Sequence, residues 1–203
     1  MTSWSAGLRW PRAKCRRRGR GSSQGRRTAS AGYLAVSSFS DGLAWVSRDG
    51  SAGWFAIDRS NAVVNGAGFD DVRPFRRGVA AVCRAGRWGA VDVAGRFVVP
   101  PQYDGFATAL HDGRYVDGFS DDGLAVVSLQ GRLGVVDRTG RLLVPPAHPA
   151  IVIHPVAFLY CTPGQRWGAL DRRGRPLVDP VFASRADVTD ELDRLLVDTR
   201  PVL

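Results

Sequence analysis

Short apolar runs recur along the chain, and each is followed by a turn that contains glycine. The runs cover residues 43–46, 79–82, 124–127 and 156–160, and the turn glycines are Gly50, Gly86, Gly131 and Gly164. Apolar runs of this length are typical of buried strands, and glycine supplies the positive φ of a tight hairpin. Each run is therefore predicted to form a hairpin with the strand that follows its turn.

The second strand of each hairpin is predicted to end at an aspartate: Asp58, Asp92, Asp137 or Asp171. After three of these aspartates comes x-x-Gly, at Gly95, Gly140 and Gly174, and in the first copy Asn61 takes the place of glycine. This pattern predicts a type I turn in which the Asp side chain accepts backbone N–H groups and the last residue is left-handed. Asn tolerates that conformation better than other non-glycine residues, so the first copy fits the same turn.

A third strand is predicted after each of these turns, at residues 63–64, 97–99, 142–144 and 177–178. Prolines follow most of them, and we expect these prolines to end the strands because proline cannot donate to a ladder. The first and third strands are apolar without alternation, which predicts that both faces of each are buried. Units of three strands must then stack face to face.

The aspartates recur at intervals of 34, 45 and 34 residues, which is typical of a repeat protein. The predicted fold class is all-β: tandem three-stranded hairpin or meander repeats, stacked as a propeller-like or open solenoid array, with a short C-terminal helix. The predicted domains are residues 1–32, a tail; 33–185, the repeat domain, with units at about 39–74, 75–118, 119–155 and 156–185; and 186–203, a helix and tail. Whether residues 33–36 close the array as an added strand is left open.

The repeated residues resemble a known family. Gly-Leu-Ala-x-Val, then Gly-x-Trp-Gly-x-x-Asp, then Gly-x-x-x-x-Pro-x-Tyr resembles the WG repeat, which is found in many bacterial proteins and is named for pairs such as Trp88-Gly89 and Trp167-Gly168. The resemblance covers roughly residues 39–185 and is looser at Trp54-Phe55 and Leu133-Gly134. It implies an all-β array with no family-wide catalytic residues and a role in binding or scaffolding.

The formal charge of +9 lies entirely in the first 30 residues. They hold nine basic and no acidic residues, whereas residues 31–203 hold nineteen Arg and nineteen acidic residues. A segment so rich in Arg, Gly and Ser is predicted to be disordered. It is either a solvated tail or an arm that binds nucleic acid or another polyanion. The candidate polyanion-binding residues are Arg16, Arg17, Arg18, Arg20, Arg26 and Arg27.

The three cysteines, Cys15, Cys83 and Cys161, show no metal spacing, and their odd number argues against a disulfide framework. Free buried thiols in a reducing compartment are the expectation. No apolar run approaches the about 18 residues that span a bilayer, and no apolar segment follows the basic N-terminus. We therefore expect a cytoplasmic protein that does not insert into a membrane.

An insertion of about eleven residues, 108–118, accounts for the longer interval between Asp92 and Asp137. Insertions in repeat proteins often project from one face and make contacts. The candidate partner-binding residues are His111, Arg114 and Tyr115; the alternative is a solvated hairpin extension. After Phe182, the spacing of Leu192, Leu195 and Leu196 predicts one amphipathic helix, capped by Thr189 or Asp190, that closes the array or docks a partner.

No constellation for catalysis or metal binding is evident in the sequence. The three histidines lack metal-ligand spacing, and Cys83 and Cys161 lie in strands expected to be buried. Asp117, Asp121 and Asp122 only faintly suggest a calcium loop, so we expect solvated acids there. The sequence thus predicts a non-enzymatic binding or scaffold protein with an unknown protein partner, no cofactor and no small-molecule substrate; the alternative is polyanion binding through the N-terminal arm.

Overall fold

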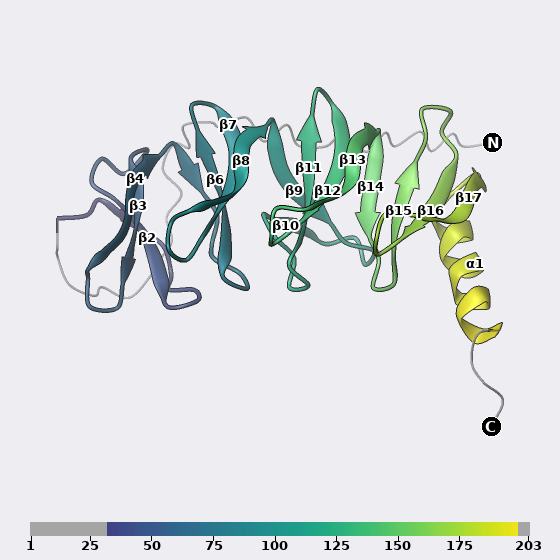
Figure 1. The fold of residues 1–203 in the computed structure, drawn as a ribbon, viewed down its shortest axis with the longest axis horizontal. Helices are drawn as coiled ribbons and strands as arrows, with labels where there is room; N and C mark the ends of the chain where they lie inside the picture. Colours follow the sequence, from purple (N-terminus) through teal and green to yellow (C-terminus); the bar gives the residue numbers. More distant parts are fainter. Residues whose placement is uncertain (1–31, 199–203) are drawn as a thin grey trace, which may run out of the picture.

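The computed structural model describes residues 32–198, and in this part of the chain four antiparallel sheets follow one another in a row (Figure 1). The first contains β1 (Ala35–Val36), β2 (Leu43–Ser47), β3 (Trp54–Asp58) and β4 (Val63–Phe69). The second contains β5 (Asp71–Val72), β6 (Val79–Arg84), β7 (Arg87–Asp92) and β8 (Phe97–Tyr103). The predicted all-β class with one short C-terminal helix is confirmed.

The third sheet is the largest. It contains β9 (Gly105–Ala109), β10 (Tyr115–Asp117), β11 (Leu124–Leu129), β12 (Arg132–Asp137) and β13 (Leu142–His148), in the order β10-β9-β11-β12-β13. The fourth contains β14 (Ala150–Ile153), β15 (Ala157–Cys161), β16 (Trp167–Asp171) and β17 (Pro176–Phe182). The predicted hairpins are present as β2–β3, β6–β7, β11–β12 and β15–β16.

Each sheet has an unpredicted strand added beside the first of the three predicted per unit, and the third sheet also has β10. The added strands are β1, β5, β9 and β14, which pair with the first predicted strand of each unit. A single residue, Asp70, Asp104 or Pro149, joins the last strand of one sheet to the added strand of the next. Each sheet therefore begins before the unit assigned to it from the sequence, and residues 35–36 form the first strand of the first sheet.

The inner strands of the sheets are buried on both faces, as predicted for the first strand of each unit. Val79 and Ala81 of β6 belong to a core cluster shared with the third sheet, whereas Ala80 and Val82 belong to one shared with the first sheet. Trp88 is 1% exposed in the former cluster. The apolar core thus runs through the row, between every pair of neighbouring sheets.

The last strand of each sheet departs from the prediction in two ways. These strands do not end at proline, since β8 continues through Pro100 and Pro101 and β13 through Pro145 and Pro146. They are also not buried on both faces: in β8 only Val99 and Tyr103 are buried. The prolines are tolerated because they lie on an edge strand, at the place where the pairing register with β7 shifts.

The glycine of the Trp-Gly pair lies beneath this irregularity. A Cβ built on Gly89 would approach Pro101 N to 2.8 Å, and Gly168 has the same relation to Pro180 N at 2.9 Å. Real Cβ atoms do not come within 3.0 Å of such atoms. The glycine therefore makes room for the irregular strand, while the tryptophan before it packs in the core.

The glycine that closes each Asp turn also makes a close approach, to the preceding sheet. A Cβ on Gly140 would collide with the carbonyl oxygen of Val98 in β8, and one on Gly174 with the carbonyl oxygen of Leu143 in β13. On Gly95 it would lie 2.7 Å from Cγ of Asn65 in β4. All three glycines also have positive φ, between 80° and 86°. Each turn thus fixes how closely one sheet stacks on the sheet before it.

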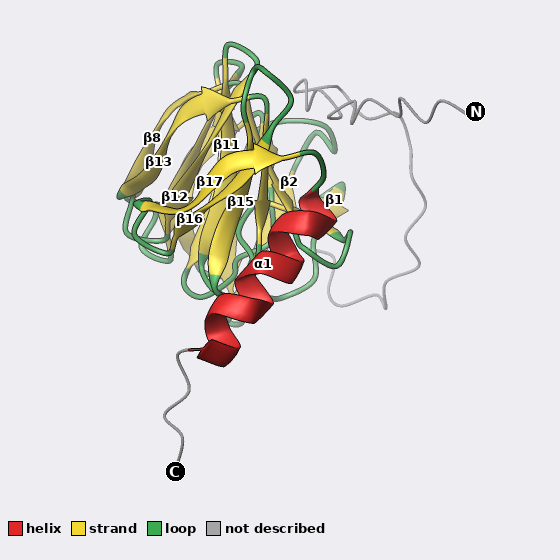
Figure 2. Ribbon diagram, turned by 90° about the vertical axis from the view of Figure 1, so that its right-hand side faces the viewer, coloured by secondary structure: helices red, strands yellow, loops and turns green. Residues whose placement is uncertain are grey.

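The helix α1 (Arg185–Asp198) lies against the last sheet (Figure 2). Its Val188 and Leu192 are buried with Trp167 and Phe182. The predicted role in closing this end is confirmed by that packing; the predicted cap is wrong, and of the predicted face only Leu192 is buried. The helix starts at Arg185, and the Asp187 N–H donates to Ser184 Oγ at 3.2 Å while the Ser184 N–H donates to Asp187 Oδ2 at 3.1 Å, a capping-box geometry. Leu195 and Leu196, one turn beyond Leu192, remain about 40% exposed.

Candidate functional site

The four repeated aspartates act within their own turns. Asp92 Oδ1 accepts the N–H groups of Ala94 and Arg96 at 3.0 and 2.9 Å, and the equivalent oxygen of Asp171 accepts those of Arg173 and Arg175 at 2.8 and 2.9 Å. Asp58 and Asp137 accept the same pair of N–H groups in their turns. The predicted turn role is confirmed, and it occupies the carboxylates.

These hydrogen bonds favour the charged carboxylate. The Arg175 N–H holds the pKa of Asp171 below its ordinary value, and the Ser60 hydroxyl does the same for the pKa of Asp58. At Asp92, partial burial acts to raise the pKa, but the Arg96 N–H and guanidinium outweigh it and the pKa is lowered. Side chains held ionised by their own turn are poor proton donors or acceptors near neutral pH.

The insertion at 108–118 is a hairpin that adds β10 to the edge of the third sheet. Thr108 anchors its base: the buried hydroxyl donates to Gly118 O at 2.7 Å and accepts the Val126 N–H at 3.0 Å. At its tip the His111 N–H donates to Ile153 O of the fourth sheet at 2.9 Å. The hairpin therefore bridges two sheets, which the sequence alone did not indicate.

The three candidate partner-binding residues do not form one cluster. His111 packs edge-on against His154, with ring centroids 5.1 Å apart. Arg114 is paired with Asp112 of the same turn at 2.6 Å, and Tyr115, on β10, is 50% exposed. A contact with a partner through His111, Arg114 and Tyr115 stays a prediction.

Histidine and cysteine side chains are engaged in packing. Burial lowers the pKa of His148 and of His154, and it raises the pKa of Cys161, which is a free, buried thiol as predicted. Cys83 is disulfide-bonded, so the prediction of a free thiol is wrong there. A disulfide is unusual in a reducing compartment. The cytoplasmic location stays a prediction; within residues 32–198 no helix has the length and apolarity to cross a membrane.

The acids that faintly suggested a calcium loop are paired with arginines rather than simply solvated. Asp121 lies 2.7 Å from Arg76 Nη1, Asp122 lies 2.9 Å from Arg172 Nη2, and Asp117 Oδ2 lies 3.7 Å from Arg73 Nε. In the described part of the chain, no group of three or more His, Cys, Asp or Glu side chains is arranged to hold a metal ion. These pairs instead tie the second sheet to the third and the third to the fourth.

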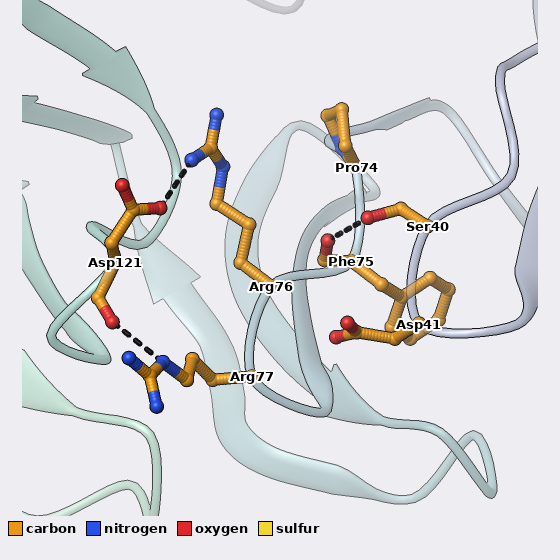
Figure 3. A pocket seen from close by; sticks show the side chains of 7 residues that line it. All are labelled: Ser40, Asp41, Pro74, Phe75, Arg76, Arg77 and Asp121. Carbon is orange, nitrogen blue, oxygen red and sulfur yellow. Dashed lines mark hydrogen bonds and ion pairs between the residues drawn. The ribbon is translucent and has the colours of Figure 1, made fainter.

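An open pocket of about 420 Å³ lies among the loops that precede β2, β6 and β11 (Figure 3). It is lined by Ser40, Asp41, Pro74, Phe75, Arg76, Arg77 and Asp121. Asp41 Oδ2 accepts the Gly78 N–H at 2.7 Å, and Arg77 Nε donates to Asp121 O at 2.7 Å. The Ser40 hydroxyl also donates to Phe75 O, which closes one wall.

A second exposed feature runs along the last strands of the four sheets. Apolar side chains at or next to the first position of these strands are exposed by 37–55%: Val63, Phe97, Leu142 and Leu177. The turns before β13 and β17 carry the exposed residues Arg138, Arg141 and Arg173, for which no ion pair with a described residue is recorded. We call Val63, Phe97, Leu142 and these three arginines the edge stripe. The sequence did not predict this exposed feature because its apolar runs resemble those of buried strands.

The candidate polyanion-binding residues Arg16, Arg17, Arg18, Arg20, Arg26 and Arg27 lie outside the described residues. The edge stripe and the pocket, by contrast, lie within them and on different strands and loops. They are the two surfaces that the structure adds to those identified from the sequence.

Comparison with known proteins supports the repeat assignment. Residues 54–88 and 88–132 match the family model of the WG containing repeat, which confirms the resemblance for two adjacent repeats. No curated protein matches the chain.

Three solved structures are loosely similar to the chain. The computationally designed Ika4 protein has 15% identity and a TM-score of 0.38, covering 76% of this chain and 99% of that one. The computationally designed Ika8 protein has 15% identity and a TM-score of 0.37, covering 75% and 50%. A streptogramin B lyase has 16% identity and a TM-score of 0.27, covering 74% and 69%. At these TM-scores the likenesses carry no argument about activity.

Proposed function

Because residues 54–132 carry WG-type repeats, we propose that the chain is a non-enzymatic scaffold that binds a protein partner. Its polar side chains are largely engaged in turns and in pairs between sheets, which supports an interaction role over catalysis. The observation that carries the proposal is the edge stripe, where exposed apolar side chains of the last strands follow turns that carry exposed arginines.

The partner that fits the edge stripe is an apolar segment with acidic residues beside it. Val63, Phe97 and Leu142 occupy the same register position in three successive sheets, each two strand residues before the buried Asn65, Val99 or Val144. Packed sheets lie about 10 Å apart, so the apolar side chains recur at about that interval. Carboxylates on the partner complement Arg138, Arg141 and Arg173.

The array is proposed to be an open solenoid rather than a closed propeller. The turn glycine of each later unit makes the close approach to the sheet before it, whereas the first turn has Asn61 at that position. The side chain of Asn61 could not lie as close to a preceding sheet as Gly95, Gly140 and Gly174 do. The α1 helix lies at the other end, against the fourth sheet. Both features support an array with two separate ends.

Site-specific photocross-linking tests the binding role. A cross-linking amino acid at position 142, on the edge stripe, is expected to capture a defined partner, and the yield should fall when Arg138 and Arg141 are replaced by Gln. The matched control is position 36 on β1, where Val36 is 57% exposed on the opposite edge of its sheet. Equal capture from positions 36 and 142, or a yield indifferent to the two Arg→Gln changes, contradicts the proposal.

A second candidate function rests on the charge of the first 30 residues, where nine basic residues occur with no acid. Such an arm binds nucleic acid or another polyanion by releasing counterions, so the affinity falls steeply with salt. Removal of the arm is expected to abolish that affinity. Absence of nucleic-acid binding by the full chain at low salt rules this function out.

A further inference from the structure

Arginine side chains connect the loops that precede β6, β11 and β15 at two places. Between the third and fourth sheets, Arg172 Nε donates to Pro155 O at 3.1 Å and its Nη2 lies 2.9 Å from the Asp122 carboxylate. Between the second and third sheets, Arg77 Nε donates to Asp121 O at 2.7 Å, and Arg76 Nη1 lies 2.7 Å from the Asp121 carboxylate. In both places guanidinium groups meet a loop carbonyl and a loop carboxylate.

The first and second sheets lack this guanidinium. Asp41 holds the position of Asp122, two residues before the first residue of its strand, and Val93 holds the position of Arg172, directly after the turn aspartate. Asp41 and Val93 both contact the loop before β6. The Val93 N–H donates to Gly78 O at 3.1 Å, and the Gly78 N–H donates to Asp41 Oδ2. Valine is too short and too apolar to pair with the carboxylate.

The pocket of Figure 3 lies at this place. It brings Asp41 together with the loop that contains Arg77, and the side chains of Arg76 and Arg77 extend toward Asp121, away from Asp41 (Figure 3). Arg76 is neutralised there by its ion pair with Asp121. No ion pair of Asp41 with a described residue is recorded, so its carboxylate keeps acceptor capacity beyond the Gly78 hydrogen bond.

We propose that this pocket is a guanidinium site, which takes the side chain of an arginine that does not belong to the repeats. The guanidinium pairs with the Asp41 carboxylate and donates to the carbonyl of Arg77, as Arg172 does with Asp122 and Pro155. Guanidinium is preferred over ammonium because its planar set of donors serves a carboxylate and a carbonyl at once. This proposal does not depend on the edge stripe.

Two sources supply the same group. One is an arginine on a partner. The other is the chain itself, since residues 1–31 contain eight arginines: Arg9, Arg12, Arg16, Arg17, Arg18, Arg20, Arg26 and Arg27. The chemistry at Asp41 is identical in the two cases, and the experiment separates them.

The test is a two-dimensional NMR titration of the full chain with N-acetyl-arginine amide, with N-acetyl-lysine amide as the matched probe. We expect the arginine probe to shift the Gly78 and Asp41 amide signals and to bind at least tenfold more tightly than the lysine probe. Asp41→Asn keeps an acceptor for Gly78 N–H but loses the charge, and Val93→Arg supplies the missing side chain from within the chain. Both substitutions should weaken binding at least tenfold.

A second full-length variant, with the eight N-terminal arginines replaced by lysine, identifies the source. If this variant binds the probe and the unsubstituted chain does not, the chain's own arginine occupies the site. If both chains bind the probe equally, the arginine that occupies the site comes from a partner.

Three outcomes overturn the proposal. The first is that neither chain binds, and the second is that the arginine and lysine probes bind alike. The third is that Asp41→Asn, introduced into whichever of the two chains binds the probe, binds it as tightly as that chain does. Loss of binding in Asp41→Asn but not in Val93→Arg overturns the equivalence with Arg172.

Discussion

The first and last Asp turns of the array share one geometry and differ in what lies behind them. In both, the aspartate accepts two backbone N–H groups of its turn, and the closing residue has positive φ, 66° at Asn61 and 81° at Gly174. Behind Gly174 lies the carbonyl oxygen of Leu143, too close for any side chain. The first turn has no preceding sheet among the described residues, and there the chain carries asparagine.

Two separate constraints act on the closing residue of each Asp turn. The left-handed conformation favours glycine but also accepts asparagine. The close approach of a neighbouring backbone accepts only glycine. Because Asn61 meets the first constraint and not the second, the residue at this position distinguishes a unit that stacks on another from the unit at which the stack begins.

The largest expected effect comes from Gly140→Ala. The methyl group collides with Val98 O and is held at positive φ, so the third sheet must move away from the second. Together these terms lower the free energy of unfolding by about 2 to 5 kcal/mol. Urea denaturation measures it, and Asn61→Ala is the matched control, with an expected loss below about 1 kcal/mol. Equal losses for the two variants would show that stacking does not depend on the glycine.

A smaller loss is expected from Asp171→Asn. The substitution keeps one acceptor for the Arg173 and Arg175 N–H groups but removes the charge and the 2.7 Å ion pair with Arg175. The thermal midpoint should fall, by less than for Gly140→Ala. Asp58→Asn, at the first turn, should give a still smaller fall because no ion pair with an arginine is recorded there. A larger fall at Asp58 contradicts this ranking.

Acid should act through the same turns. The pKa values of Asp58, Asp92 and Asp171 are lowered in the folded chain, so these groups add stability that is present above their unfolded pKa of about 4. That stability is lost as the pH falls below about 4 toward the folded values. The free energy of unfolding, measured from pH 6 to pH 2, should fall less steeply in Asp171→Asn. An unchanged slope would mean that Asp171 does not contribute.

The smallest effect is expected from Asn61→Gly. Glycine adopts positive φ more readily than asparagine, but it also adds freedom to the unfolded chain, so the free energy of unfolding should change by no more than about 0.5 kcal/mol. The measurement is again urea denaturation. A gain of several kcal/mol would indicate that a side chain is as poorly tolerated at position 61 as at position 140.

The local parts of the fold follow from the sequence. Apolar runs, hairpin glycines and the Asp-x-x-Gly pattern act within a few residues of chain, so they predicted the inner hairpins and the turn chemistry of Asp92 and Asp171. The short strand β5 was missed because two residues, Asp71 and Val72, carry no periodicity. The helix start was misplaced because Ser184 and Asp187 cap it before its apolar spacing is visible.

The candidate surfaces depend on contacts between units and were not predictable in the same way. The contact of Gly140 with Val98 joins residues 42 positions apart, and neither segment contains a pattern that predicts the contact. The edge stripe was hidden because Phe97 and Leu142 belong to apolar runs that resemble buried strands. The pocket is formed by loops from three sheets, and the carboxylate of Asp41 in it, which has no ion pair with a described residue, is recognised only by comparison with the Asp122–Arg172 pair.

The distance between the ends of the array tests the central claim most directly. Spin labels carried by unnatural amino acids at positions 63 and 177 avoid the native cysteines and sit on the last strands of the first and fourth sheets. Three sheet-to-sheet intervals of about 10 Å each separate the two labels. Double electron–electron resonance should therefore give one label-to-label distance distribution centred near 30 Å or beyond, where about 30 Å is three such intervals. A distribution centred near the roughly 10 Å of neighbouring sheets would mean that the first and fourth sheets meet and that Asn61 does not mark an open end.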